Sequence, residues 1–256
     1  MLSHCGIEGR SVQPGLFRII SVGKTDCGLR RANNEDAFLV KPEFGFCLVA
    51  DGMGGAAAGE LASQIFSETV MEVFSTPDLS LSDPVKLVQQ SFISANDRIL
   101  KHTDEIPAHK GMGCTAELMA FSGDKFFLGH MGDSRTYRLK NRQLKQLSRD
   151  HSLVQEQLEK GLITPTEARK HKMKNVILRA VGVDETPALD LVRGNLSAGD
   201  LFLLCSDGLT DMIEDADILA VLSSTALLKQ KAEKLVELAK AAGGHDNVTV
   251  VLIEII

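Results

Sequence analysis

The chain has 256 residues, 44% of them hydrophobic, and carries a formal net charge of −6. This length and apolar content suffice for one large core. No linker rich in Pro, Gly or Ser divides the chain, so we expect a single domain. The acidic balance argues against nucleic acid as the main partner, because binding to a phosphate backbone needs a basic surface.

The apolar runs and the cysteines indicate the compartment. No run approaches the ~20 residues needed to cross a bilayer, and the N-terminus lacks the basic and apolar regions of a signal peptide. The five cysteines form no CxxC pair. Cys47 and Cys205 lie inside apolar runs, as reduced core thiols do. We therefore expect a soluble, cytoplasmic monomer without a membrane partner.

Apolar periodicity predicts an α+β chain. Residues 1–15 are polar and are expected to be irregular. Strands are predicted at residues 16–22, 37–40, 44–50, 113–121, 125–131, 134–139, 143–147, 200–205 and 248–256. Helices are predicted at residues 57–75, 83–99, 215–222 and 227–242. The turns within 113–147 are too short for a crossover helix, so those four strands are predicted to be antiparallel neighbours.

An apolar run over residues 44–50 ends at Asp51, in the sequence DGMGG. The glycines let the backbone turn sharply, and a carboxylate beside an exposed carbonyl suits a hard cation. A strand-to-helix turn capped by Asp explains the same five residues, and that simpler reading is favoured when the stretch is taken alone. The choice depends on further carboxylates in similar settings.

Three such carboxylates follow: Asp133, Asp207 and Asp246, each between an apolar strand and a Gly-bearing turn. Unpaired carboxylates gathered at one end of a sheet would repel one another, so the cluster needs a cation. Oxygen ligands without a Cys or His cluster favour Mg²⁺ or Mn²⁺ over Zn²⁺. Two such ions could clamp a phosphoryl group and supply a hydroxide for in-line attack.

The polar stretch 23–36 contains Arg31, Glu35 and Asp36. Arg is the side chain best shaped to hold a phosphate through paired donors, and the carboxylates could hold metal-bound water. A surface ion pair beside an Asn turn explains these residues equally well.

Residues 149–174 are predicted to form a charged helical excursion from the sheet, with a capping box at Thr164 and Glu167. Within it, the run 169–174 (RKHKMK) is favoured as a solvated face, and contact with an acidic or phosphorylated partner is the alternative. His130, His151 and His245 lie near the aspartates, and a structural role is favoured for each.

Five motifs in one order resemble the metal-dependent protein phosphatase family, PPM or PP2C, in its bacterial form. They are RANNED at residues 31–36, DGMGG at 51–55, GDSR at 132–135, SDG at 206–208 and GHDN at 244–247. The resemblance implies a four-layer α-β-β-α sandwich of two antiparallel sheets flanked by helices. It implies a phosphatase domain over residues 16–256, a flap subdomain at 149–174 and a strand within 175–182.

The resemblance also implies roles for single residues. Asp51 should bridge two metals and the Gly52 carbonyl should bind one of them, with Asp207 and Asp246 completing a site. Asp133 should bind a third ion together with Asp207. Arg31 should bind the substrate phosphate. Glu35 and Asp36 should hold metal-bound water, and Asn247 should lie beside the metal ligands without binding the metal itself. The general acid stays unassigned, because Met53 and Ala56 stand where other members have His.

The implied function is hydrolysis of phosphoserine and phosphothreonine in proteins by a metal-bridging hydroxide, with two or three Mn²⁺ or Mg²⁺ ions and Arg31, Asp51 and Asp207 as catalytic residues. The protein would oppose a bacterial-type Ser/Thr kinase. One alternative is a catalytically weak regulatory module that binds phosphoproteins on the same fold. The other is a different metal-dependent phosphoesterase, such as a nuclease or a small-molecule phosphatase.

Overall fold

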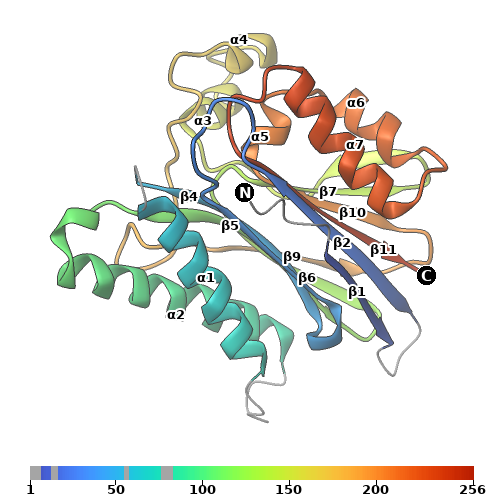
Figure 1. The fold of residues 1–256 in the computed structure, drawn as a ribbon, viewed down its shortest axis with the longest axis horizontal. Helices are drawn as coiled ribbons and strands as arrows, with labels where there is room; N and C mark the ends of the chain where they lie inside the picture. Colours follow the sequence, from blue (N-terminus) through green and yellow to red (C-terminus); the bar gives the residue numbers. More distant parts are fainter. Residues whose placement is uncertain (1–6, 13–16, 55–57, 76–82) are drawn as a thin grey trace.

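The structure is a computed structural model that describes residues 7–12, 17–54, 58–75 and 83–256. Two antiparallel sheets lie face to face, and helices cover the outer face of each (Figure 1). This arrangement confirms the predicted four-layer sandwich. None of the helices in these ranges combines the length and apolar character that crossing a bilayer would need.

The first sheet has six strands in the order β1-β2-β11-β10-β7-β8. The strands are β1 (Ile7–Val12), β2 (Arg18–Asp26), β7 (Arg135–Lys140), β8 (Gln143–Gln146), β10 (Leu201–Cys205) and β11 (Val248–Ile255). The helices packed on it are α5 (Asp207–Thr210), α6 (Asp215–Leu222) and α7 (Leu228–Ala241).

The second sheet has five strands in the order β3-β4-β5-β6-β9. The strands are β3 (Asp36–Lys41), β4 (Phe46–Met53), β5 (Gly113–Ser122), β6 (Lys125–Met131) and β9 (Asp190–Asn195). It is covered by α1 (Ala58–Ser75) and α2 (Pro84–Glu105), and short 3₁₀ turns lie at Pro42–Phe44 and Pro107–His109. The remaining helices, α3 (Leu153–Glu159) and α4 (Pro165–Arg169), lie apart from both helical layers (Figure 1).

Three apolar layers hold the sandwich together, and β11 contributes to two of them. Val250 and Leu252 pack against the helices of the first sheet, whereas Val251 and Ile253 face the second sheet. Because side chains alternate between the faces of a strand and both faces are buried here, the strand reads as an unbroken apolar run.

Two predicted helix starts are confirmed by their caps. The Asp83 carboxylate accepts a hydrogen bond from the Val85 N–H at 3.0 Å, with Pro84 in the first turn of α2. Thr164 and Glu167 exchange the two hydrogen bonds of a capping box at the start of α4. Both starts were encoded locally, because a cap needs only the residues of one helical turn.

The N-terminal expectation was wrong in two respects. Residues 7–12 form β1, paired with β2, where an irregular segment was expected. Strand β2 itself continues to Asp26, into the stretch predicted to be polar connection, because Val248 to Ile255 of β11 pair along it. Leu16, Gly55, Ala56 and Ala57, which bear on other predictions, lie outside the described residues.

Three further expectations need correction. Strands β6 and β7 belong to different sheets, so the 132–134 turn crosses between the sheets instead of joining hairpin neighbours. Residues 175–182 form no strand and make only the isolated bridges Ser152–Ile177 and Cys114–Val181. Strand β9, which was not predicted, lies beside β6 at the edge of the second sheet. Each of these three features depends on pairing between segments that are distant in the sequence, and local patterns do not show such pairing.

Candidate active site

Asp51 lies within β4, close to the point where the two sheets meet. The register pairs it with Asp36 of β3 on one side and with Thr115 of β5 on the other. Directly opposed residues on neighbouring strands point to the same face, so the two carboxylates are neighbours. The predicted strand ended before Asp51, whereas the observed strand continues to Met53 and holds this carboxylate from both sides.

Asp36 is anchored from the opposite sheet. Its Oδ2 accepts hydrogen bonds from Ser206 Oγ at 2.8 Å and from Thr249 Oγ1 at 2.6 Å. Its Oδ1 is buried and has no partner within the described ranges. Burial raises the pKa of Asp36 to about 6, although the two hydroxyls oppose this.

Three further aspartates reach this region from the connections between strands. Asp133 lies in the turn between β6 and β7, Asp207 opens α5 just after β10, and Asp246 precedes β11. Burial raises the pKa of Asp51 well above its usual value, and repulsion from Asp36, Asp207, Asp133 and Asp246 raises it further. The structure therefore brings together all four aspartates predicted from the sequence.

Two of these carboxylates have an oxygen without a partner. Asp133 Oδ1 and Asp207 Oδ1 are buried and make no hydrogen bond to any described residue. Burial and neighbouring carboxylates raise the pKa of Asp133 to about 7 and that of Asp207 well above its usual value. Buried acceptors without a donor or a cation are costly, so these oxygens are poised to bind a cation.

The glycine after an aspartate permits close backbone packing. A Cβ at Gly52 would lie 2.0 Å from the Gly59 carbonyl oxygen, and one at Gly208 would lie 1.9 Å from the Asn247 carbonyl oxygen. No side chain fits at either position, which explains the Asp-Gly pairs in structural terms. Gly52 also donates its N–H to Glu35 O at 3.1 Å, so β4 is tied to the segment before β3.

Asn247 holds the loop that carries Arg31. Its Nδ2 donates to Cys27 O at 3.0 Å and to Asn33 O at 2.9 Å, and its Oδ1 accepts from Glu35 N at 2.8 Å. The side chain is only 4% exposed. It therefore clamps both ends of the loop against the start of β11.

Arg31 projects from this loop and is half exposed. Its Nη2 donates to Asp246 Oδ2 at 2.7 Å, while Asp246 Oδ1 accepts from Asn247 N at 2.8 Å. The ion pair suggested as an alternative for Arg31 is thus present. Its partner is one of the four clustered aspartates, and the guanidinium lies at their edge.

The clustered carboxylates open into a cavity of about 700 Å³, which we call the aspartate cavity. The charged residues of its wall are Arg31, Glu35, Asp51, Asp207 and Asp246. Residues 175–177, which follow the segment 149–174, also line this cavity, as do Met53 and Thr115. Four carboxylates, one guanidinium and the segment that follows residues 149–174 thus line the same cavity.

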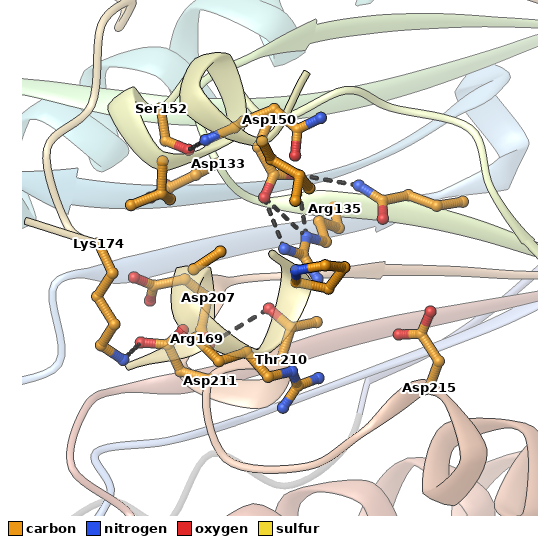
Figure 2. A pocket seen from close by; sticks show the side chains of 16 residues that line it. Asp133, Arg135, Asp150, Ser152, Arg169, Lys174, Asp207, Thr210, Asp211 and Asp215 are labelled. Atoms are coloured by element: carbon orange, nitrogen blue, oxygen red, sulfur yellow. Dashed lines mark hydrogen bonds and ion pairs between the residues drawn. The ribbon is translucent and has the colours of Figure 1, made fainter. Parts of the chain in front are cut away.

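A second cavity of about 350 Å³ lies under residues 149–174, and Asp207 lines both cavities. Figure 2 shows Asp133, Asp207 and Asp211 around it, with Lys174 reaching across to form an ion pair with Asp211. On the other side, Arg135 makes a paired contact with Asp150, at 2.9 Å from Nε to Oδ1 and 2.6 Å from Nη2 to Oδ2.

Two of the three histidines near the motifs, His130 and His151, have structural partners. Buried His130 contacts Glu117 through Nδ1 and donates from Nε2 to Arg149 O at 2.7 Å. Burial lowers its pKa, but the Glu117 carboxylate and these hydrogen bonds outweigh burial and raise it to about 9. Buried His151 accepts from Gly132 N at 3.2 Å. His130 and His151 do not line the aspartate cavity, whereas His245 is exposed.

The donor set fits a hard divalent ion. In the described part of the chain, no three His, Cys, Asp or Glu side chains form a ready metal site. Mg²⁺ typically keeps several waters and takes only one or two carboxylates. The partnerless oxygens of Asp36, Asp133 and Asp207 meet that requirement, and burial first, then neighbouring carboxylates, raises the pKa of each.

Three acidic residues that lie around the site were not identified from the sequence. Glu117 is a lone charge within the apolar strand β5 and forms a buried cluster with His130 and Thr136. Asp211 follows Asp207 by four residues, the spacing that places two side chains on one helical face. Both patterns were visible in the sequence. The contact of Asp150 with Arg135 was not, since it joins two separate segments.

Comparisons with known proteins agree with this geometry. The family model for protein phosphatase 2C matches residues 29–241. The chain is 37% identical over 234 residues to the serine/threonine protein phosphatase PstP of Mycobacterium tuberculosis, covering 91% of this chain and 44% of that protein. It is 35% identical over 236 residues to the serine/threonine phosphatase Stp of Listeria monocytogenes, covering 90% and 94%.

A crystal structure of the catalytic domain of PstP in complex with two manganese ions superposes with a TM-score of 0.84 at 35% identity. The match covers 93% of this chain and 98% of that one. The similarity thus extends over the sequence and over the fold. The chain belongs to the protein phosphatase 2C family.

Proposed function

We propose that the protein hydrolyses phosphoserine and phosphothreonine in proteins with the help of Mn²⁺ or Mg²⁺. The observation that carries the proposal is the gathering of Asp51, Asp207 and Asp246 beside Arg31 in one cavity, where Asp207 keeps a buried oxygen without a partner among the described residues. Such a cavity attracts divalent cations, and the cations together with the guanidinium attract a phosphoryl group. The relatives named as serine/threonine phosphatases support this substrate class.

The metal ligands we assign are Asp51, the Gly52 carbonyl, Asp207 and Asp246, with Asp133 and Asp207 holding a third ion. When bound, the ions polarise the phosphoryl group and activate water. The two manganese ions in the related catalytic domain support the choice of metal. The partnerless oxygens of Asp133 and Asp207 on the second cavity support the third site.

The chain's own residues bind and orient the substrate. Asp246, which accepts from Arg31 at 2.7 Å, is one of the residues that would hold a metal, and Arg31 would then be free to bind the substrate phosphate. Asn247 keeps the Arg31 loop in place, and Asp36 and Glu35 hold water near the ions. No buried histidine is required as the acid, because His130 and His151 are engaged elsewhere.

The wider context is also part of the proposal. Residues 16–256 would form the phosphatase domain, with residues 149–174 as its flap. We infer a monomer in the cytoplasm that opposes a Ser/Thr kinase. The free thiols of Cys27, Cys47, Cys114 and Cys205 suit a reducing compartment.

The test is hydrolysis of a phosphothreonine peptide by the wild type and by Asp207→Asn, each with Mn²⁺ and with EDTA. We expect Mn²⁺-dependent turnover that EDTA abolishes and that the substitution lowers more than about 100-fold. Asp97→Asn, the same change on an exposed part of α2, is the matched control and should keep full activity. A folded wild type that binds Mn²⁺ without turnover would instead favour the phosphoprotein-binding module.

A further inference from the structure

The flap carries a concentrated positive charge on an acidic protein. Residues 169–174 (RKHKMK) contain four of the 28 basic side chains of a chain whose net charge is −6. Lys170 and Lys172 are exposed, and their ammonium groups contact no described acidic residue. Two unpaired cations this close together are available to an anionic ligand.

Both ends of this basic run are fastened to the core. Arg169 forms an ion pair with Glu214 at 3.6 Å, and Lys174 forms one with Asp211. In Figure 2, Arg169 and Lys174 both reach toward the segment around α5. The backbone between them is turned by a hydrogen bond from Lys174 N to His171 O at 3.2 Å. The two free lysines therefore lie between two ion pairs that join this run to the core.

The run leads directly into the wall of the aspartate cavity. Residues 175–177 line the cavity that also contains Arg31, and Lys172 precedes them by three residues. At about 3.5 Å per extended residue, Lys172 lies within about 10 Å of the wall along the chain. An extended peptide covers the same distance in about three residues. Val176, one of these wall residues, is 40% exposed and offers an apolar contact to such a peptide.

We propose that Lys170 and Lys172 bind acidic side chains of the phosphoprotein substrate, a few residues from the phosphorylated Ser or Thr. This inference rests on the proposed function and names its preferred substrates: phosphorylation sites flanked by Asp or Glu. An acidic peptide segment suits the surface better than a nucleic acid, because the net charge of the protein is −6 and a long polyanion would also meet its acidic remainder.

The experiment compares two phosphothreonine peptides that differ only in flanking residues, Asp and Glu in one and Asn and Gln in the other. The enzymes are the full chain with Mn²⁺ and its variant Lys170→Glu/Lys172→Glu. The matched control, Lys86→Glu/Lys234→Glu, makes the same charge change on α2 and α7, where both lysines are exposed. Thermal unfolding establishes that all three proteins are folded.

We expect the wild type to prefer the acidic peptide by about three- to tenfold in kcat/KM, the size that two exposed charge contacts can supply. The preference should lie in KM, because these contacts are equal in the ground and transition states. It should shrink at about 0.5 M salt. The flap variant should lose this preference, and its kcat/KM for a peptide flanked by lysines should rise. A merely structural role of the two lysines would not produce that rise.

Three outcomes would overturn the inference: no preference in the wild type, an equal loss in the control variant, or tighter binding of a single-stranded RNA than of the acidic peptide by the same lysines. In each case, Mn²⁺-dependent hydrolysis of the neutral peptide would leave the proposed function intact. Failure of the wild type to hydrolyse either peptide would contradict the proposed function itself.

Discussion

At the scale of single residues, Asn247 controls where Arg31 stands. One amide side chain satisfies three backbone groups of the loop, two carbonyls and one N–H. It is buried, so its removal would leave those groups without partners in a place that water reaches poorly. Asp246 next to it carries the Arg31 ion pair. The loop and the carboxylate that we propose as a metal ligand are thus set by the adjacent residues Asn247 and Asp246.

We therefore expect Asn247→Ala to loosen the Arg31 loop. The free energy of unfolding should fall by about 1–3 kcal/mol because buried polar groups lose their partners. KM for an aryl phosphate should rise, measured by initial rates in Mn²⁺. Asn195→Ala, at an exposed position ending β9, is the control. An unchanged KM in Asn247→Ala would show that Arg31 is placed by other contacts.

At the scale of elements, the turn between β6 and β7 and the flap define the second cavity. The turn crosses from one sheet to the other and thereby carries Asp133 to the junction of the sheets. The flap is closed over this cavity by the ion pairs Lys174–Asp211 and Arg169–Glu214. Lys174 and Asp211 are each about one third exposed.

Lys174→Ala should let the flap open more often, since it removes one of its two ion pairs to the α5–α6 region. We expect chymotrypsin to cleave within residues 158–173 about threefold faster, because local opening exposes the backbone. Lys160→Ala is the control, since Lys160 pairs only with Glu156 of the same helix, at 3.1 Å. Equal cleavage rates in the two variants would mean that this pair does not hold the flap.

At the scale of the whole molecule, the carboxylate cluster makes folding depend on pH and metal. The pKa of Asp133 is raised to about 7 by burial first and by Asp150 and Asp211 next, and that of Asp36 to about 6 by burial. Their unfolded values lie near 3.9. Between pH 4 and pH 7 the folded state therefore holds more protons, and the metal-free protein loses stability as the pH rises.

Asp133→Asn should remove part of this penalty. At pH 8 without metal, we expect the variant to be more stable than the wild type by on the order of 2 kcal/mol, with an advantage that vanishes near pH 4. Thermal melts at both pH values, with Asp97→Asn as control, measure it. Mn²⁺ should then stabilise the wild type more than the variant. A variant less stable than the wild type at pH 8 would contradict this account.

Local sequence was enough for the features that depend on neighbours in the chain. The caps at Asp83 and Thr164 were predicted correctly, as were most strands and the main helices, because period and capping act over one or two turns. The positions of Asp51 and Asp207 were also recognisable, since a charge followed by glycine at the end of an apolar run is a local pattern.

Only the tertiary structure decided which segments lie side by side. Strands β1 and β9 are held at sheet edges by their partners, and β6 and β7 separate into two sheets although three residues join them. The contacts of the site are also long-range. They are the hydrogen bonds from two hydroxyls to Asp36, the hydrogen bonds of Asn247 to the Arg31 loop and the Lys174–Asp211 ion pair, and they join residues from 37 to 220 positions apart. Sequence by itself determined most of the helices and strands and indicated which side chains gather at the site. Its geometry depends on long-range packing, because the hydrophobic layers that bring these segments together act without regard to distance along the chain.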